Sequence, residues 1–125
     1  MGAWGTGNLE NDDAQDEIYD RSVALVDQLW TRIQKQESWE ADEEEYGALF
    51  VDLETLFALE AGGVFNGQRL TELEDVDAVL STWLSGWSEY FPDMAEDDAV
   101  VRARREVIEA TFARFREITA KHSQQ

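Results

Sequence analysis

The chain has 125 residues, of which 43% are hydrophobic and 11% aromatic, and this is enough for one domain to bury a core without disulfides or metal ions. It has no cysteine, which excludes disulfides, thiol catalysis and thiolate metal sites. Its 28 acidic and 10 basic residues give a net charge of −18. A field of this sign repels nucleic acids and anionic membranes and attracts basic proteins.

The acidity is concentrated in one part of the chain. Residues 1–100 contain 25 acidic and four basic residues, whereas residues 101–125 contain three acidic and six basic residues. The first twenty residues lack the basic start and apolar stretch of a secretory signal. No run approaches the roughly 18 apolar residues of a membrane-spanning helix. We therefore expect a soluble cytoplasmic protein.

Apolar residues recur at helical spacing after the first ten positions. The first predicted helix spans residues 12–37, with Asn11 or Asp12 as its N-cap, because a short side-chain oxygen can accept from a free amide of the first turn. The second spans 42–61 and ends at Gly62-Gly63, since glycine adopts the left-handed conformation after a helix at little cost.

The second half of the chain predicts two more helices. A connection rich in turn residues leads to a helix over 71–88, where Thr71 and Glu74 have the spacing of a capping box. Pro92 prevents this helix from continuing. A last helix over 96–120 has acids at its start and bases towards its end, which suits the helix dipole.

Four amphipathic helices with short connections favour an all-α fold, a single-domain bundle. We expect the domain to span residues 1–120, with 1–10 as an ordered irregular arm and 121–125 as a frayed tail. Trp83 and Trp87 share a helix face and are expected in the core. The alternatives are a binding patch or the seam of a homodimer.

The sequence offers no catalytic residues with a recognisable mechanism, and we expect no enzyme activity. The only histidine, His122, falls in the predicted tail, where a partner could not hold it in place. A hydrolase triad, a histidine metal site and a histidine general base are therefore disfavoured.

Clustered acids raise the separate question of a metal site. Four such clusters lie at residues 12–20, 40–45, 72–77 and 96–98, and none has the order of an EF-hand loop. Three of them lie near predicted helix starts, where capping and the helix dipole explain them. We expect no metal and no cofactor. A carboxylate-based metal-binding protein or enzyme remains an alternative.

The sequence favours a protein-binding module that neutralises a basic toxin or nuclease, as an immunity protein does, because an acidic surface attracts a cationic cleft and competes with its phosphates. The candidate binding residues are an indole anchor and the acids that follow it, Trp39, Glu40, Asp42, Glu43, Glu44 and Glu45. A homo-oligomeric structural protein is a further alternative. No nucleic-acid or membrane partner is expected, and the sequence leaves the oligomeric state open.

The first residues, MGAWGTGNLENDDA, form a specific pattern. It resembles the start of a bacterial family catalogued as domain of unknown function 4259. The matching residues are Gly2, Ala3, Trp4, Gly5, Gly7, Asn11, Asp12 and Ala14. The resemblance implies a small helical bacterial protein and supplies no reaction.

The same residues predict a structural role for the arm. Gly2, Gly5 and Gly7 would let its backbone lie close against the bundle, and Trp4 would plug the arm into the core. Asn11 or Asp12 would then begin the first helix. On this hypothesis, Trp4→Ala costs several kcal/mol of stability, as other large aromatic truncations do.

Overall fold

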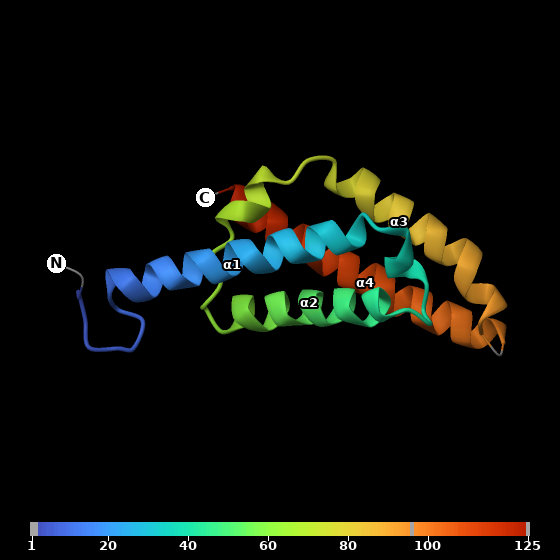
Figure 1. Cartoon of the computed structure of the whole chain (residues 1–125), viewed down its shortest axis with the longest axis horizontal. Coiled ribbons are helices and arrows are strands. Elements are labelled where there is room, and N and C mark those ends of the chain that lie inside the picture. The colour runs from blue at the N-terminus through green and yellow to red at the C-terminus, as the bar shows by residue number, and fades with distance from the viewer. Residues whose placement is uncertain (1–2, 96, 125) are drawn as a thin grey trace.

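The computed structural model describes residues 3–95 and 97–124, and these form an all-α bundle (Figure 1). Within the described residues, four α-helices carry the fold: α1 (Asp12–Ile33), α2 (Glu44–Ala61), α3 (Val76–Tyr90) and α4 (Asp98–Ser123). Three short 3-10 helices connect them: η1 (Gln36–Trp39), η2 (Gln68–Glu72) and η3 (Phe91–Asp93). No helix of these residues is both long and apolar enough to cross a bilayer.

The helices alternate in direction along the chain. In Figure 1, α1 and α2 run antiparallel and in contact, α3 returns on the other side of α1, and α4 runs behind them. The end of α4 packs against η2, which also contacts α1. Residues distant in sequence therefore meet at both ends of the bundle.

Several predicted helix ends are confirmed by their local geometry. The Asn11 side chain accepts a hydrogen bond from the amide of Ala14 at 2.8 Å, so Asn11 is the N-cap of α1. Helix α2 ends at Ala61 with Gly62 as its C-cap, and Gly63 has the left-handed φ of 74° that a side chain would strain. Helix α4, predicted from residue 96, begins at Asp98 instead, and Asp97 caps it by accepting from the amide of Val100.

Two other predicted boundaries are wrong. Helix α1 ends at Ile33 and the chain turns into η1, whereas the periodicity predicted a helix to residue 37. Helix α3 begins at Val76, because Thr71 belongs to η2 and its hydroxyl donates to the Gln68 carbonyl. The predicted capping box is therefore absent, and Asp75, with a left-handed φ of 56°, precedes α3 without capping it.

The core is built from all four helices and contains the tryptophans of α3. Trp83 and Trp87 are 0% exposed, which confirms the core prediction and excludes them from a binding patch or a homodimer seam. The other buried apolar side chains are Val26, Leu29, Ile33, Leu49, Leu53, Leu56, Phe57, Leu70, Leu80, Ile108, Phe112, Phe115 and Ile118. Aromatic rings meet edge to face inside it, as Trp83 does with Phe112 at 5.2 Å between centroids.

The prediction of a frayed tail is wrong for residues 121–123, while Gln125 lies outside the described residues. Helix α4 continues to Ser123, and both Lys121 and His122 contact Glu60 at the end of α2. The helix persists because its last turn is held by these polar contacts across the bundle.

The N-terminal arm does not plug the core, and this prediction is also wrong. Trp4 is 59% exposed, and its indole N–H donates to the carboxylate of Asp12 at 3.0 Å. The arm folds back on itself, with the Trp4 amide donating to the Glu10 carbonyl. Gly5 and Gly7 face the Glu10 side chain, so their missing Cβ atoms allow this tight loop. Gly2 lies outside the described residues.

The arm sits on an unpacked stretch of α1. No residue from Asp12 to Arg21 is buried, and burial begins at Ser22. Figure 1 shows the arm and this end of α1 extending past the end of α2. Loss of the Trp4 ring therefore removes little packing.

We predict that Trp4→Ala lowers the free energy of unfolding by less than about 1 kcal/mol, as substitutions at exposed positions usually do. Trp83→Ala is the contrasting variant, and removal of this buried ring should cost about 3–5 kcal/mol. Urea denaturation followed by circular dichroism measures both. Equal losses in the two variants would contradict the exposed arm.

Candidate partner-binding surface

The acidic candidate residues lie where η1 gives way to α2. Trp39 ends η1, residues 40–43 form the connection, and Glu44 and Glu45 open α2. Figure 1 places this connection at the end of the bundle opposite the N-terminal arm. The acids of the arm and those of the connection therefore belong to separate surfaces.

Trp39 is half-buried and packs on α3. A Cβ atom at Gly86 would overlap the indole ring of Trp39, so this glycine makes room for the ring. The neighbouring Ser38 is fully buried, and its hydroxyl accepts from the Trp83 indole N–H at 3.0 Å and donates to the Lys35 carbonyl. Trp39 consequently fixes the start of the connection that leads into α2.

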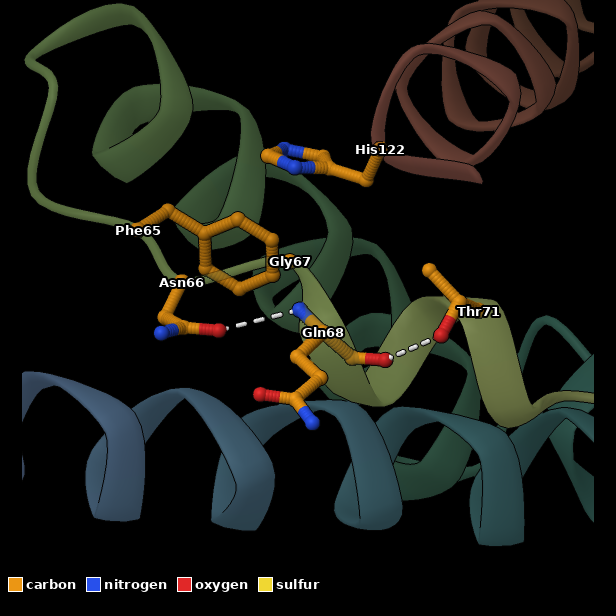
Figure 2. A pocket seen from close by; sticks show the side chains of 6 residues that line it. All are labelled: Phe65, Asn66, Gly67, Gln68, Thr71 and His122. Atoms are coloured by element: carbon orange, nitrogen blue, oxygen red, sulfur yellow. Dashed lines mark hydrogen bonds between the residues drawn. The ribbon is translucent and has the colours of Figure 1, made fainter. Parts of the chain in front are cut away.

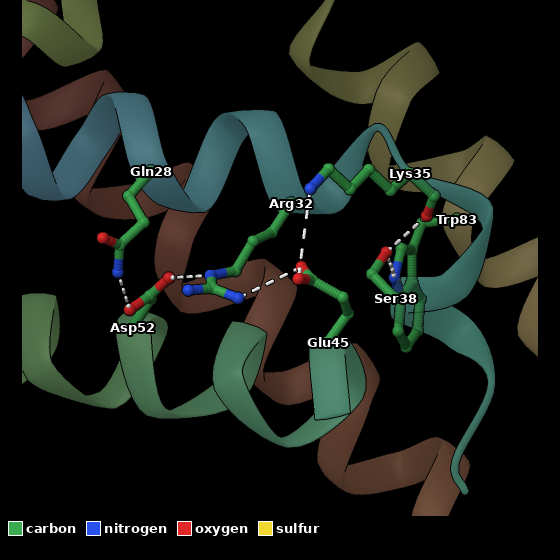
Figure 3. A network of polar contacts seen from close by, with 7 residues as sticks. All are labelled: Gln28, Arg32, Lys35, Ser38, Glu45, Asp52 and Trp83. Atoms are coloured by element: carbon green, nitrogen blue, oxygen red, sulfur yellow. Dashed lines mark hydrogen bonds and ion pairs between the residues drawn. The ribbon is translucent and has the colours of Figure 1, made fainter. Parts of the chain in front are cut away.

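Glu45 differs from the other candidate acids because it faces inward. Its carboxylate lies 3.1 Å from Arg32 and 3.9 Å from Lys35 (Figure 3). Arg32 also donates to Asp52, whose second oxygen accepts from Gln28. This network joins α1 to α2, and its basic groups neutralise Glu45 within the chain.

The remaining acids of the connection face solvent or lie at its edge. Asp42, Glu43 and Glu44 are exposed and Glu40 is partly exposed. The salt bridges among the described residues include none of these four. Their negative charge is therefore not neutralised by direct pairing in this part of the chain.

A hydrogen bond to this surface and its negative charges raise the pKa of Tyr90. The Tyr90 hydroxyl, at the end of α3, donates to the Asp42 carboxylate. This hydrogen bond, followed by desolvation and the nearby charges of Asp42, Glu40 and Glu43, raises the pKa of Tyr90 to about 12. The contact also brings the connection beside the corner between α3 and α4, which carries exposed acids at positions 93, 97 and 98.

Two of the three arginines near the start of α4, Arg104 and Arg105, lie against aromatic rings, whereas Arg102 is exposed. The Arg104 guanidinium lies 4.6 Å from the centroid of Phe50 and donates to the Tyr46 hydroxyl. Arg105 lies over Trp87 and donates to Ser88. These cations are held by ring faces and hydroxyls, as cation–π contacts allow.

A concave region lies near the C-terminal end of α4, and sequence reasoning missed it. A pocket of about 480 Å³ is lined by Phe65, Asn66, Gly67, Gln68, Thr71 and His122 (Figure 2). The His122 ring packs edge to face on Phe65, and a Cβ atom at Gly67 would overlap it. The apolar spacing of α4, continued by one turn beyond Ile118, could have placed His122 on the buried face.

His122 pairs with a carboxylate from α2. The His122 Nε2 lies 3.0 Å from Glu60, and the other Glu60 oxygen accepts from Lys121 at 2.8 Å. The His122 and Glu60 side chains are only 12% and 11% exposed. The three residues fasten α4 to α2 beside the pocket.

Beyond the Glu60–His122 pair, carboxylates and histidine do not form a metal-binding cluster in the described residues. Across residues 3–95 and 97–124, no group of three or more histidine, aspartate or glutamate side chains is arranged to hold a metal ion. The pocket combines the Phe65 ring and the His122 imidazole with amide and hydroxyl groups. In Figure 2, the Asn66 side-chain oxygen accepts a hydrogen bond from the backbone N–H of Gln68.

Comparison with protein-family models, curated proteins and solved structures gave no match. The fold and the surfaces described above therefore carry the functional argument.

We predict that the Glu60 contacts make stability depend on pH. Burial alone would raise the pKa of Glu60, but the hydrogen bonds and charges of Lys121 and His122 outweigh it and hold the pKa below the usual 4.5. A lowered folded-state pKa stabilises the fold above the unfolded value, and this stabilisation disappears as the pH falls through the folded value. The stability difference between the parent and Glu60→Gln should therefore shrink below about pH 4.5.

Urea denaturation at a series of pH values measures this difference. Glu54→Gln is the matched control, since Glu54 is exposed on the same helix and makes no salt bridge in the described part of the chain. A difference for Glu60→Gln that stays constant down to pH 2 would contradict the expected linkage.

We also predict that Asp42→Asn lowers the pKa of Tyr90 from about 12 towards its usual 10.0, because the hydrogen bond to a charged acceptor is lost. Carbon NMR of the tyrosine rings, followed as the pH is raised, measures this value. Glu43→Gln should lower it less, since Glu43 acts only through its charge. A Tyr90 that titrates near 10 in the parent would show that the hydrogen bond does not persist in solution.

Proposed function

We propose that this chain is an acidic protein-binding module that binds a basic protein through the connection between η1 and α2. The observation that supports this most directly is that Glu40, Asp42, Glu43 and Glu44 have no salt-bridge partner in the described residues, although Glu45 beside them has two. We call these four residues the acidic connection.

The physical basis is long-range attraction followed by local pairing. A net charge of −18 raises the rate at which a cationic partner arrives, and surface acids then pair with its lysines and arginines. A cleft that holds nucleic-acid phosphates has the charge pattern that such acids can imitate. The proposed partner is therefore a basic toxin or nuclease, and the chain would act as its immunity protein.

The anchored geometry of the acidic connection supports this role. Trp39 and Ser38 fix the end of η1 on α3, and the Arg32–Glu45 pair fixes the first turn of α2. Holding both ends in place reduces the conformational entropy that binding would cost. Trp39 thus serves the proposal mainly as a support, with its partly exposed ring beside the acids.

The cellular setting belongs to the same proposal. The absence of cysteine suits a reducing cytoplasm. The N-terminal pattern that resembles domain of unknown function 4259 suggests a bacterial origin. The proposal assigns a binding role and no reaction.

The test is the salt dependence of binding to a basic protein recovered by affinity capture at low ionic strength. We predict that affinity falls steadily as salt is raised, because exposed charges are screened. Combined Glu40→Gln, Glu43→Gln and Glu44→Gln should weaken binding by about tenfold at low salt, since each exposed ion pair contributes roughly 0.2–1 kcal/mol.

The control removes the same amount of charge from the other end of the molecule, by combined Asp12→Asn, Asp13→Asn and Asp16→Asn. This variant should weaken binding by less than the first, because its acids lie on the separate N-terminal surface. Affinity that does not change with salt, or an equal loss in both variants, would overturn the proposal. If the captured partner is a nuclease, its inhibition by this chain is a second readout.

A further inference from the structure

An apolar groove lies beside Trp39, between the end of α1, η1 and α3. Its volume is about 440 Å³. Ile33 and Trp39 come from the α1–η1 side, and Ala78, Val79 and Thr82 come from α3. Because α1 ends at Ile33, it does not continue along α3, and η1 packs on α3 instead. The groove therefore lies where α1 ends at Ile33 and the chain enters η1.

The floor of the groove suits an apolar side chain. Ile33 is buried and belongs to the core, and Val79 and Trp39 are partly buried against it. Ala78 and Thr82 lie one turn apart on α3 and are exposed, so their small side chains leave the groove open to solvent. A leucine-sized side chain bound here would transfer its apolar surface from water to these side chains, which favours binding.

The rim of the groove is acidic. Asp75 lines it at the end nearest the start of α3 and is exposed. Asp75 has a left-handed φ of 56°, and its side chain does not cap α3. None of the salt bridges among the described residues includes its carboxylate.

Other acidic residues lie close to the groove in the sequence. Glu40 of the acidic connection directly follows Trp39, and Glu37 is exposed on η1. The bases nearby pair with other acids: Arg32 and Lys35 pair with Glu45 on α2 (Figure 3). Arg116, which lines a neighbouring pocket together with Asp75 and Ala78, pairs with Asp77. The groove thus has an apolar floor of Ile33, Trp39 and Val79. Its lining also includes the polar residues Gln34, Gln36 and Thr82, and Asp75 supplies the charge.

We propose that this groove receives an apolar side chain from the basic partner, from a segment in which lysine or arginine flanks a leucine-like residue. The apolar side chain packs on Ile33, Trp39 and Val79, and the flanking cations pair with Asp75 and Glu40. This inference rests on the proposed function and adds the chemistry that the partner presents. Charge alone would accept many basic proteins, whereas an apolar residue at a fixed place between cations selects among them.

The experiment uses two short lysine-rich peptides that differ at one central position, leucine in one and alanine in the other. Binding of each to the full chain is measured by fluorescence anisotropy at low salt. We expect the leucine peptide to bind about tenfold more tightly, which is the order of affinity gained by burying one such side chain.

Three variants assign this difference to the groove. Ala78→Tyr fills it, and the leucine peptide should then bind no better than the alanine peptide. Ser81→Tyr is the matched control, because Ser81 is exposed on α3 and does not line the groove. It should leave the tenfold difference intact. Asp75→Asn removes the rim charge while keeping a residue that tolerates the left-handed conformation, and it should weaken both peptides.

The outcomes separate this inference from the proposed function. If both peptides bind equally, and their binding falls with salt and with loss of the acidic connection, the groove is not a docking site although the charge mechanism stands. If neither peptide binds at low salt, both proposals are wrong. If Ser81→Tyr abolishes the leucine preference as Ala78→Tyr does, the preference arises elsewhere on α3. Circular dichroism of each variant confirms that it has folded.

Discussion

The hydrogen bond from the Trp83 indole to Ser38 is the constraint on which much of this structure depends. Both side chains are fully buried, and the Ser38 hydroxyl gives the indole N–H a partner inside the protein, which offsets the hydration that this group loses on burial. Ser38 supplies that partner only if η1 is held against α3. This position sets Trp39 over Gly86, opens the groove beside it and fixes where the acidic connection begins.

The sequence predicted the all-α bundle because the governing signals are local and periodic. Apolar spacing identified the four helices, and single residues such as Asn11 and Gly63 set helix ends through their own backbone or side-chain chemistry. Thr71 failed as a cap because a 3-10 turn can use the same hydroxyl. Nothing within a few residues of Thr71 distinguishes the two uses, and the packing of η2 on α4 decides between them.

The candidate surface was predictable in composition but not in arrangement. The acids at positions 40–45 were visible in the sequence, yet the inward turn of Glu45 depends on Arg32 of another helix. Trp4 and His122 were misplaced for a related reason. Trp4 was expected in the core and is exposed, whereas His122 was expected in a frayed tail and is held against Glu60. The burial of residues near either end of the chain depends on contacts with residues distant in the sequence, which local patterns do not reveal.

The exposed arm gives the molecule a spectroscopic label of its own. Of the five tryptophans, Trp83 and Trp87 are shielded from water, Trp30 and Trp39 are partly shielded, and Trp4 alone is mostly open. Emission from Trp4 should be the most red-shifted and the most accessible to quenchers. The acids around it would favour caesium over iodide as the quenching ion. Ordinary fluorescence can therefore separate events at the arm from events at the groove, where Trp39 lies, without any attached dye.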